Sequence, residues 1–148
     1  MTQVQSVRDG ADSTTPILKR EAGWQVFMML RTVFIVAPLL FGIDKFFNLM
    51  VQWPNYLAPI VTDVVPVTAQ HFMYAVGVIE IVAAICVFLF PRFGSVLVAA
   101  WLAGIIVNLL ILGSGYDVAL RDFGLFVAAL ALFRLSFVYS ASARAKRA

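Results

Sequence analysis

Three charged residues, Arg31, Glu80 and Arg134, interrupt otherwise apolar stretches of the chain. On insertion scales, a charge at the centre of a lone membrane helix costs roughly 2.5–3.5 kcal/mol, so such residues need a partner. Their expected depths differ by about one to one and a half helical turns, which an arginine stem can reach across. We therefore predict that Glu80 pairs with Arg31, Arg134 or both.

Two interpretations of this buried cluster remain open. It is either a satisfied ion pair that fixes helix register, or a ligand-binding or proton-relay site, since ionisable residues inside membranes are functional candidates by default. Gly77, Ala83 and Ala84 lie three or four residues from Glu80, on the same face of a helix. Small residues mark a face that packs against other helices, so Glu80 is predicted to face inward.

A second polar set is expected toward the outer side and could line a vestibule. The set includes Asp44, Asn48 and His71, and its candidate site residues are Lys45, Asn108, Asp117, Arg121 and Asp122. Asn108 is predicted to hydrogen-bond a neighbouring helix, as buried asparagines in membrane bundles do. The alternative is that all these residues are ordinary polar groups at the level of the lipid headgroups.

No standard catalytic or metal-binding motif is present in the sequence. His71 is the only histidine and Cys86 the only cysteine, so bis-histidine haem ligation and an intrachain disulfide are both excluded. We predict no catalytic residue and no metal site. Whether the protein is an enzyme stays open, and a role that is not catalytic by itself is favoured.

The elements that carry these residues are four long apolar runs. Hydrophobic residues make up 62% of the 148-residue chain and charged residues 13%, whereas globular domains have about 45–50% and 25%. Each run is long enough for a helix that crosses a bilayer. The prediction is an all-α polytopic membrane protein, a four-helix bundle in one domain (24–139), with the lipid bilayer and not nucleic acid as its partner. The expected spans are 24–43, 71–90, 94–113 and 120–139.

Basic residues outside the spans are distributed unequally between the two sides. Two of them, Lys45 and Arg121, fall in the outer loops, and seven fall in the tails and the second loop: Arg8, Lys19, Arg20, Arg92, Arg144, Lys146 and Arg147. This positive-inside asymmetry predicts that both termini are cytoplasmic. We expect a flexible tail over 1–23 and a basic tail over 140–148. The apolar loop 44–70 contains three prolines and should form short segments that lie in the outer interface or fold over the bundle.

Several short motifs resemble those of DoxX-like membrane proteins. Arg31, Gly42 and Lys45 in "RTVFIVAPLLFGIDK" are similar to the first span of that family. Glu80 in "EIVAAICVFLF", followed by "PRFG", resembles its second span and turn, and "RLS" at Arg134 resembles the end of its fourth span. The chain has Ala83 and Ala84 where the family usually has a glycine pair.

The resemblance implies a four-helix bundle in a bacterial cytoplasmic (inner) membrane, with Arg31, Lys45, Glu80 and Arg134 as its important residues. It also implies association with redox partners, so our first hypothesis is a membrane subunit of a quinone-linked or oxidative-stress redox system. Such a subunit would bind a lipophilic ligand such as a quinone or dock an oxidoreductase. The alternatives are a non-enzymatic carrier or binding protein for a small amphipathic solute, for which a homo-oligomer is expected, and a structural assembly subunit.

Overall fold

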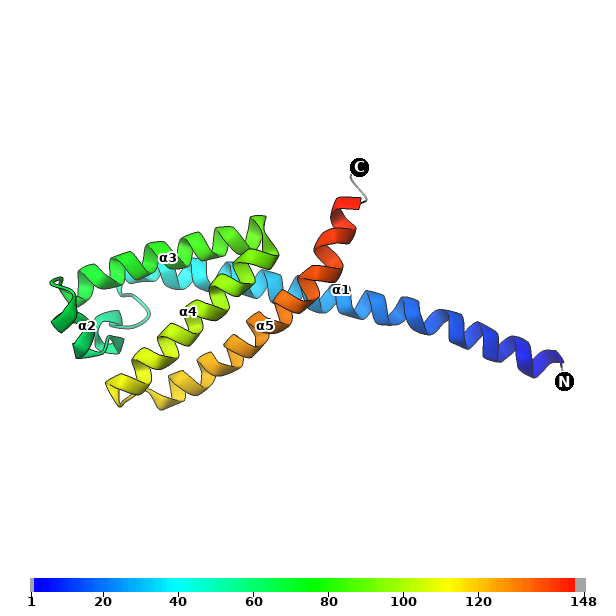
Figure 1. Cartoon of the computed structure of the whole chain (residues 1–148), viewed down its shortest axis with the longest axis horizontal. Coiled ribbons are helices and arrows are strands. Elements are labelled where there is room, and N and C mark those ends of the chain that lie inside the picture. Colours follow the sequence, from blue (N-terminus) through cyan, green and yellow to red (C-terminus); the bar gives the residue numbers. More distant parts are fainter. Residues whose placement is uncertain (1, 146–148) are drawn as a thin grey trace.

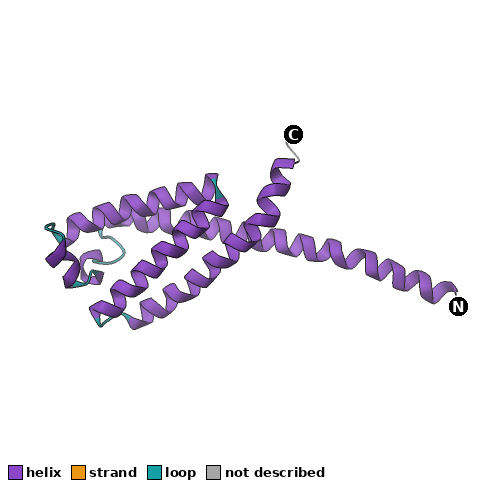
Figure 2. Ribbon diagram, viewed as in Figure 1, coloured by secondary structure: helices purple, strands orange, loops and turns teal. Residues whose placement is uncertain are grey.

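A computed structural model describes the backbone of residues 2–145 and the side chains of residues 20–140. These residues form five α-helices and one short 3-10 helix, and no strand occurs among them (Figure 2). The elements in chain order are α1 (Thr2–Phe47), η1 (Trp53–Tyr56), α2 (Pro59–Val64), α3 (Ala69–Leu89), α4 (Pro91–Leu112) and α5 (Tyr116–Ala145).

Four of these helices contain segments long and apolar enough to cross a membrane: Arg20–Phe47, Ala69–Leu89, Pro91–Leu112 and Tyr116–Ser140. Large apolar side chains remain exposed along all four, for example Met29, Phe88, Leu110 and Phe123. A bilayer would cover these side chains and leave the backbone hydrogen bonds inside the helices. The predicted all-α bundle with four membrane helices is confirmed, and the chain is a multi-pass membrane protein.

The four long helices form a ring in which each helix is antiparallel to its neighbours. α1 packs on α3 and α4 packs on α5, and contacts between α3 and α4 and between α1 and α5 close the ring. Both chain ends lie beyond the same end of the bundle, called here the terminal end (Figure 1). The opposite end carries η1 and α2 and is called the loop end.

Specific residues end the helices close to the predicted boundaries. Asn48 has a φ of 52° and terminates α1, with its N–H donating to the carbonyl of Asp44. Gly113 terminates α4 in the left-handed conformation at φ 72°, and its N–H donates to Leu109 and Leu110 carbonyls. Only Phe90 separates α3 from α4. The third membrane helix, α4, therefore begins at Pro91 rather than at 94 as predicted.

The first helix is much longer than its predicted span. α1 is continuous from Thr2, and its N-terminal half projects beyond the bundle (Figure 1), where we expected a flexible tail. At the other end of the chain, α5 continues to Ala145 through most of the predicted basic tail. Residues 146–148 of that tail lie outside the described residues.

The apolar loop folds over the loop end of the bundle, which is the second of the two arrangements expected for it. Leu57 and Ala58, between η1 and α2, are buried. Leu57 packs with Met73 and Val76 of α3 in a small apolar cluster. A larger core lies toward the terminal end, built from Phe27, Phe34, Ala83, Val87, Val98, Ala99, Leu102, Ala129, Leu132 and Tyr139.

A glycine pair sets the distance between α1 and α3. A Cβ atom placed on Gly77 would lie 2.6 Å from the carbonyl oxygen of Gly42, and one on Gly42 would lie 2.8 Å from that of Gly77. Such contacts are with rigid backbone, so any side chain at either position must push the helices apart. The pair also fixes an antiparallel register, with Gly42 level with Gly77.

Gly77→Ala is expected to destabilise the protein by about 1–3 kcal/mol, because an added methyl group overpacks this interface. The matched control is Gly104→Ala on α4, where a Cβ atom would meet nothing within 4 Å and the change should be neutral or slightly stabilising. The measurement is the free energy of unfolding by titration with SDS in mixed micelles. Equal effects of the two substitutions would refute the role given to the glycine pair.

Candidate functional site

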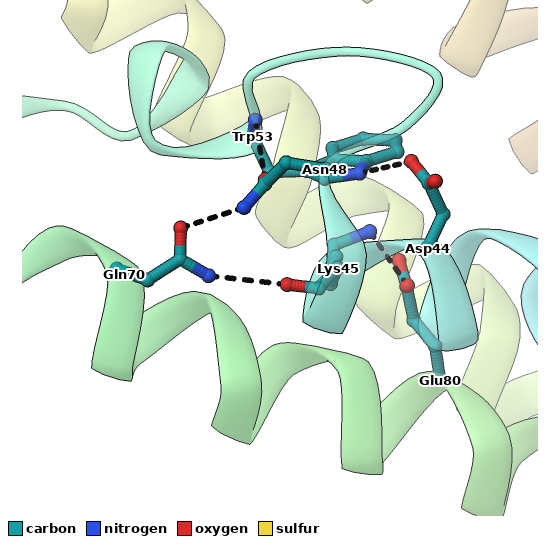
Figure 3. A network of polar contacts seen from close by, with 6 residues as sticks. All are labelled: Asp44, Lys45, Asn48, Trp53, Gln70 and Glu80. Atoms are coloured by element: carbon teal, nitrogen blue, oxygen red, sulfur yellow. Dashed lines mark hydrogen bonds and ion pairs between the residues drawn. The ribbon is translucent and has the colours of Figure 1, made fainter.

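The centre of the candidate site is an ion pair between Lys45 of α1 and Glu80 of α3. The Nζ atom of Lys45 donates a hydrogen bond of 2.7 Å to Oε2 of Glu80 (Figure 3). Lys45 is 3% exposed and Glu80 is 7% exposed. Both charges are therefore removed from water, and each needs the other to offset the loss of hydration.

The two side chains meet because of their directions, although their backbones are offset. With Gly42 level with Gly77, Glu80 is level with Leu39, and Lys45 lies six residues farther along α1, a rise of about 9 Å. Side chains in helices lean toward the helix N-terminus. In this antiparallel pair Lys45 leans toward the terminal end and Glu80 toward the loop end, so they converge.

Trp53 of η1 covers the lysine. The Nζ atom of Lys45 lies 3.6 Å from the centroid of the Trp53 ring, a cation–π contact. The indole Nε1 of Trp53 donates a hydrogen bond of 2.7 Å to Oδ2 of Asp44. The ring also packs edge-on against Phe41 of α1. The start of the loop is thus held directly on the ion pair (Figure 3).

Asp44 and its neighbours hold the chain where it leaves α1. The carboxylate of Asp44, 6% exposed, accepts hydrogen bonds from the backbone N–H groups of Leu49 and Met50 as well as from Trp53. Asn48 donates to Gln70 of α3 over 2.9 Å, and Gln70 donates to the carbonyl of Lys45 over 3.1 Å. These bonds join the end of α1 to the beginning of α3.

The prediction that Glu80 faces inward is confirmed, since it is buried on one face of α3 with Gly77, Ala83 and Ala84. The predicted partners, Arg31 and Arg134, were wrong. Arg31 donates from its guanidinium to the carbonyl of Phe88, near the end of α3. The reason is again side-chain direction, because Arg31 leans toward the terminal end and away from Glu80.

Arg134 of α5 is exposed on the outside of the bundle. Among the described side chains, ion pairs join only Lys45 to Glu80 and Arg121 to Asp122. The structure therefore brings Glu80 together with neither arginine. It brings Glu80 together with Lys45, which the sequence had assigned to the outer vestibule.

The other vestibule residues do not form one group. Asp117 lines an open depression of about 510 Å³ at the loop end, between the η1 region and the loop that joins α4 to α5. The side chain of Arg121 is 68% exposed, and its Nε atom lies 3.8 Å from Oδ1 of Asp122. Asp122 itself is only 8% exposed and belongs to the interior of the bundle.

Asn108 of α4 bonds to the covering loop instead of to a neighbouring helix as predicted. Its Oδ1 atom accepts from the N–H of Ala58 over 2.9 Å, and its Nδ2 atom donates to the carbonyl of Tyr56 over 2.6 Å. One amide side chain thus satisfies two backbone groups of the loop, as buried backbone groups require.

Asn108→Leu is expected to release the loop from α4, because it leaves the N–H of the buried Ala58 and the carbonyl of the half-buried Tyr56 without partners, at up to about 1–3 kcal/mol each. Amide hydrogen exchange of residues 53–64 should accelerate, whereas exchange in the terminal-end half of α3 should not. Conserved protection of the loop in the variant would contradict this role. Leu110→Asn, at an exposed neighbouring position on α4, is the control for a polarity change that does not touch the loop.

Trp101 of α4 completes the surroundings of Glu80. Its indole Nε1 is buried and has no hydrogen-bond partner among the described residues. The indole lies close enough to interact with the Glu80 carboxylate, without the geometry of a full hydrogen bond. A buried donor without a full hydrogen bond is costly in an apolar bundle, so this indole N–H has capacity left for a further acceptor.

Sequence reasoning missed Trp53, Gln70 and Trp101 as site residues, and it placed Asp44 in the outer polar set rather than at the ion pair. A usable signal was present for Trp53, which lies in an apolar loop too rich in aromatic residues to be solvated. Nothing in the sequence distinguished Gln70 or Trp101. Among the residues with described side chains, no three His, Cys, Asp or Glu are grouped so as to hold a metal ion.

The site thus combines a primary ammonium donor, a carboxylate and an indole N–H that lies near the carboxylate without a full hydrogen bond, all inside an apolar bundle. This set can bind a ligand that carries both hydrogen-bond acceptors and an exchangeable proton. Comparisons of the chain with protein-family models, with curated proteins and with solved structures gave no match.

Proposed function

We propose that the protein is a DoxX-like membrane subunit of a redox system, and that it binds the polar head of a quinone-like lipophilic ligand at Lys45 and Glu80. The observation that carries the proposal is the Lys45–Glu80 pair, buried in an apolar bundle beside the indole N–H of Trp101, which lies near the Glu80 carboxylate without a full hydrogen bond. Lipophilic ligands reach such a centre from the bilayer, and their polar heads need donors and acceptors there.

The residues around the centre suit a quinone in both of its redox states. The carbonyl oxygens of a quinone accept hydrogen bonds, for which Lys45 and Trp101 are donors. The hydroxyl groups of a quinol donate, and Glu80 is an acceptor for them. Bound quinone supplies two-electron redox chemistry, and the electrons belong to a partner oxidoreductase. The chain itself binds and orients the head group.

The orientation of the protein in its membrane follows from the charge pattern. Basic residues outside the spans favour a cytoplasmic terminal end, where a soluble oxidoreductase would dock. The membrane is then a bacterial cytoplasmic membrane, as the family resemblance implies. Arg31, which binds the end of α3, and the exposed Arg134 belong to this cytoplasmic end rather than to the ligand site.

The test is extraction of lipophilic ligands from the protein in native nanodiscs, followed by mass spectrometry. Wild type, Glu80→Gln and the control Arg134→Gln are prepared in parallel, with circular dichroism to check folding. Stoichiometric quinone in wild type and Arg134→Gln, lost in Glu80→Gln, supports the proposal. Absence of quinone from a folded wild-type protein overturns it and favours a structural assembly subunit.

A second candidate is a binding protein for an amphipathic solute, and the open depression lined by Asp117 favours it. In that function the solute binds at the loop end, outside the apolar core. Asp117→Asn should then abolish binding while Glu80→Gln leaves it intact, which is the reverse of the pattern expected for quinone. Binding of radiolabelled solutes to the two variants separates the candidates.

A further inference from the structure

The depression at the loop end offers polar side chains that the fold itself does not use. Its volume of about 510 Å³ lies within the range of small-molecule sites. Four of the side chains that line it are polar and come from both of its walls: Gln52, Asn55, Ser114 and Asp117. None of these four side chains has a hydrogen bond or an ion pair among the described residues, so all four can bind a ligand.

Contacts outside the depression hold its two walls in place. On the wall formed by η1, the side chain of Asn108 donates to the carbonyl of Tyr56 over 2.6 Å, and the Tyr56 ring lies 6.3 Å from that of Trp53. On the other wall, Gly113 and Gly115 turn the chain from α4 into α5 with φ angles of 72° and 73°, which glycine adopts without strain. The depression is therefore preformed and does not depend on a ligand for its shape.

Asp117 is the only charged residue that lines the depression. It is exposed, and neither of the two ion pairs among the described side chains includes it. Arg121, one turn farther along α5, pairs with Asp122 instead. The N-terminus of α5 also borders the depression, but its positive charge of about half an elementary charge is smaller than the full charge of the carboxylate. The depression therefore favours a cation over an anion.

The other polar groups suit a cation that carries N–H donors. The side-chain oxygens of Gln52, Asn55 and Ser114 accept hydrogen bonds, as the carboxylate of Asp117 does. An ammonium group donates three such bonds, and the one to a carboxylate is strengthened by charge on both partners. The half-buried ring of Tyr56 adds an aromatic face for a cation–π contact.

Apolar side chains form the rest of the lining, namely those of Val51, Leu112 and Val118. They suit a hydrocarbon part attached to the ammonium group. A Ca²⁺ ion fits the site less well, because it takes about six to eight oxygen ligands that usually include several carboxylates. Here one carboxylate is present, and an apolar wall lies beside it.

We propose that the depression binds the primary ammonium group of an amphipathic amine, with Asp117 as its ion-pair partner and Tyr56 as its aromatic contact. Two sources supply this chemistry, a free amine and the headgroup of a phosphatidylethanolamine lipid. The inference rests on the second candidate function and names its solute class. It is separate from quinone binding, because the two sites share no residue.

The test is isothermal titration calorimetry of the full-length protein in phosphatidylcholine nanodiscs, with the heat of empty nanodiscs subtracted. The probe is n-hexylammonium, and 1-hexanol and hexanoate are matched probes without a positive charge. The wild type should bind hexylammonium at least about 10-fold more tightly than either of them, because a hydrogen bond between charged groups is worth that much or more.

Substitutions assign this binding to the depression. Asp117→Asn should weaken the binding of hexylammonium by at least about 10-fold, and Asp117→Glu, which retains the charge, should restore most of it. Tyr56→Leu should weaken it by roughly 2- to 5-fold through loss of the cation–π contact. The matched control is Asp63→Asn, which removes an exposed aspartate of α2 that does not line the depression and should leave the affinity unchanged.

Two results would overturn the proposal. One is equal affinity of hexylammonium for the wild type and a folded Asp117→Asn variant. The other is tighter binding of hexanoate than of hexylammonium, which would leave the second candidate function in place with an anionic solute. Added Ca²⁺ should not displace the amine. Displacement by Ca²⁺ that disappears in Asp117→Asn would assign the site to a metal ion and would also overturn the proposal.

Nanodiscs that contain phosphatidylethanolamine separate the two sources of the ammonium group. If the lipid headgroup occupies the depression, hexylammonium should bind more weakly in these nanodiscs than in phosphatidylcholine, and the difference should be absent from Asp117→Asn. Equal binding in the two lipids supports a free amine as the ligand. Quinone extraction from the same preparations tests the Lys45–Glu80 site independently.

Discussion

Lys45→Met should destabilise the protein by about 3–5 kcal/mol, which is the cost of removing one partner from a buried ion pair. Methionine retains the apolar stem of lysine and fills a similar volume. The loss therefore reports on the charge and not on packing. Glu80 would be left buried in the bundle without a cation, and Trp53 would lose the ammonium group beneath its ring.

Two controls separate the ion pair from general damage. Arg134→Gln removes a basic residue that is exposed on α5, and it should change the free energy of unfolding by less than about 0.5 kcal/mol. Adding Glu80→Gln to Lys45→Met should restore much of the lost stability, because a neutral amide replaces the unpaired carboxylate. A loss in the double variant equal to the sum of the two single losses would contradict the pairing.

Trp53→Ala should cost about 3 kcal/mol, at the low end of the range for large aromatic residues because Trp53 is only partly buried. The substitution removes three contacts together: the cation–π contact with Lys45, the hydrogen bond to Asp44 and the packing on Phe41. The loop should detach from the ion pair, so hydrogen exchange should accelerate at residues 48–57.

Trp53→Phe separates the contribution of the hydrogen bond from those of the cation–π contact and the ring packing. Phenylalanine keeps a ring over the lysine but has no N–H for Asp44, so we expect a loss of about 1 kcal/mol, typical of one hydrogen bond. Lys45 should stay paired with Glu80 in this variant. If Trp53→Phe is as damaging as Trp53→Ala, the hydrogen bond to Asp44 and not the cation–π contact holds the loop in place.

The four helices and most of their ends were predictable because they depend on local sequence. A run of about 20 apolar residues forms a membrane helix whatever its neighbouring elements are, since hydrocarbon offers the backbone no other hydrogen-bond partners. Gly113 stops α4 through its own conformation. The extent of α1 was less predictable, since its polar N-terminal part lacks the apolar run by which a membrane helix is recognised.

The burial of Glu80 was also readable from the sequence, because small residues at helical spacing mark the packed face of α3. The identity of its partner was not. Depth counted along each helix favoured the arginines, but the contact between Gly42 and Gly77 and the lean of each side chain determine which charges meet. Lys45 lies too far along α1 by backbone position and reaches Glu80 only through its stem.

The chain by itself thus determines an all-helical membrane bundle and the presence of buried charge within it, because both follow from hydrophobicity and helical period. Tertiary structure alone determines that Lys45 and Trp101 meet at Glu80 and that Trp53 covers the lysine. These residues come from α1, α4 and η1, and their meeting depends on interhelical register and on the fold of the covering loop. Register is set by packing between helices distant in sequence, here by the close approach of Gly42 and Gly77, which no local pattern encodes.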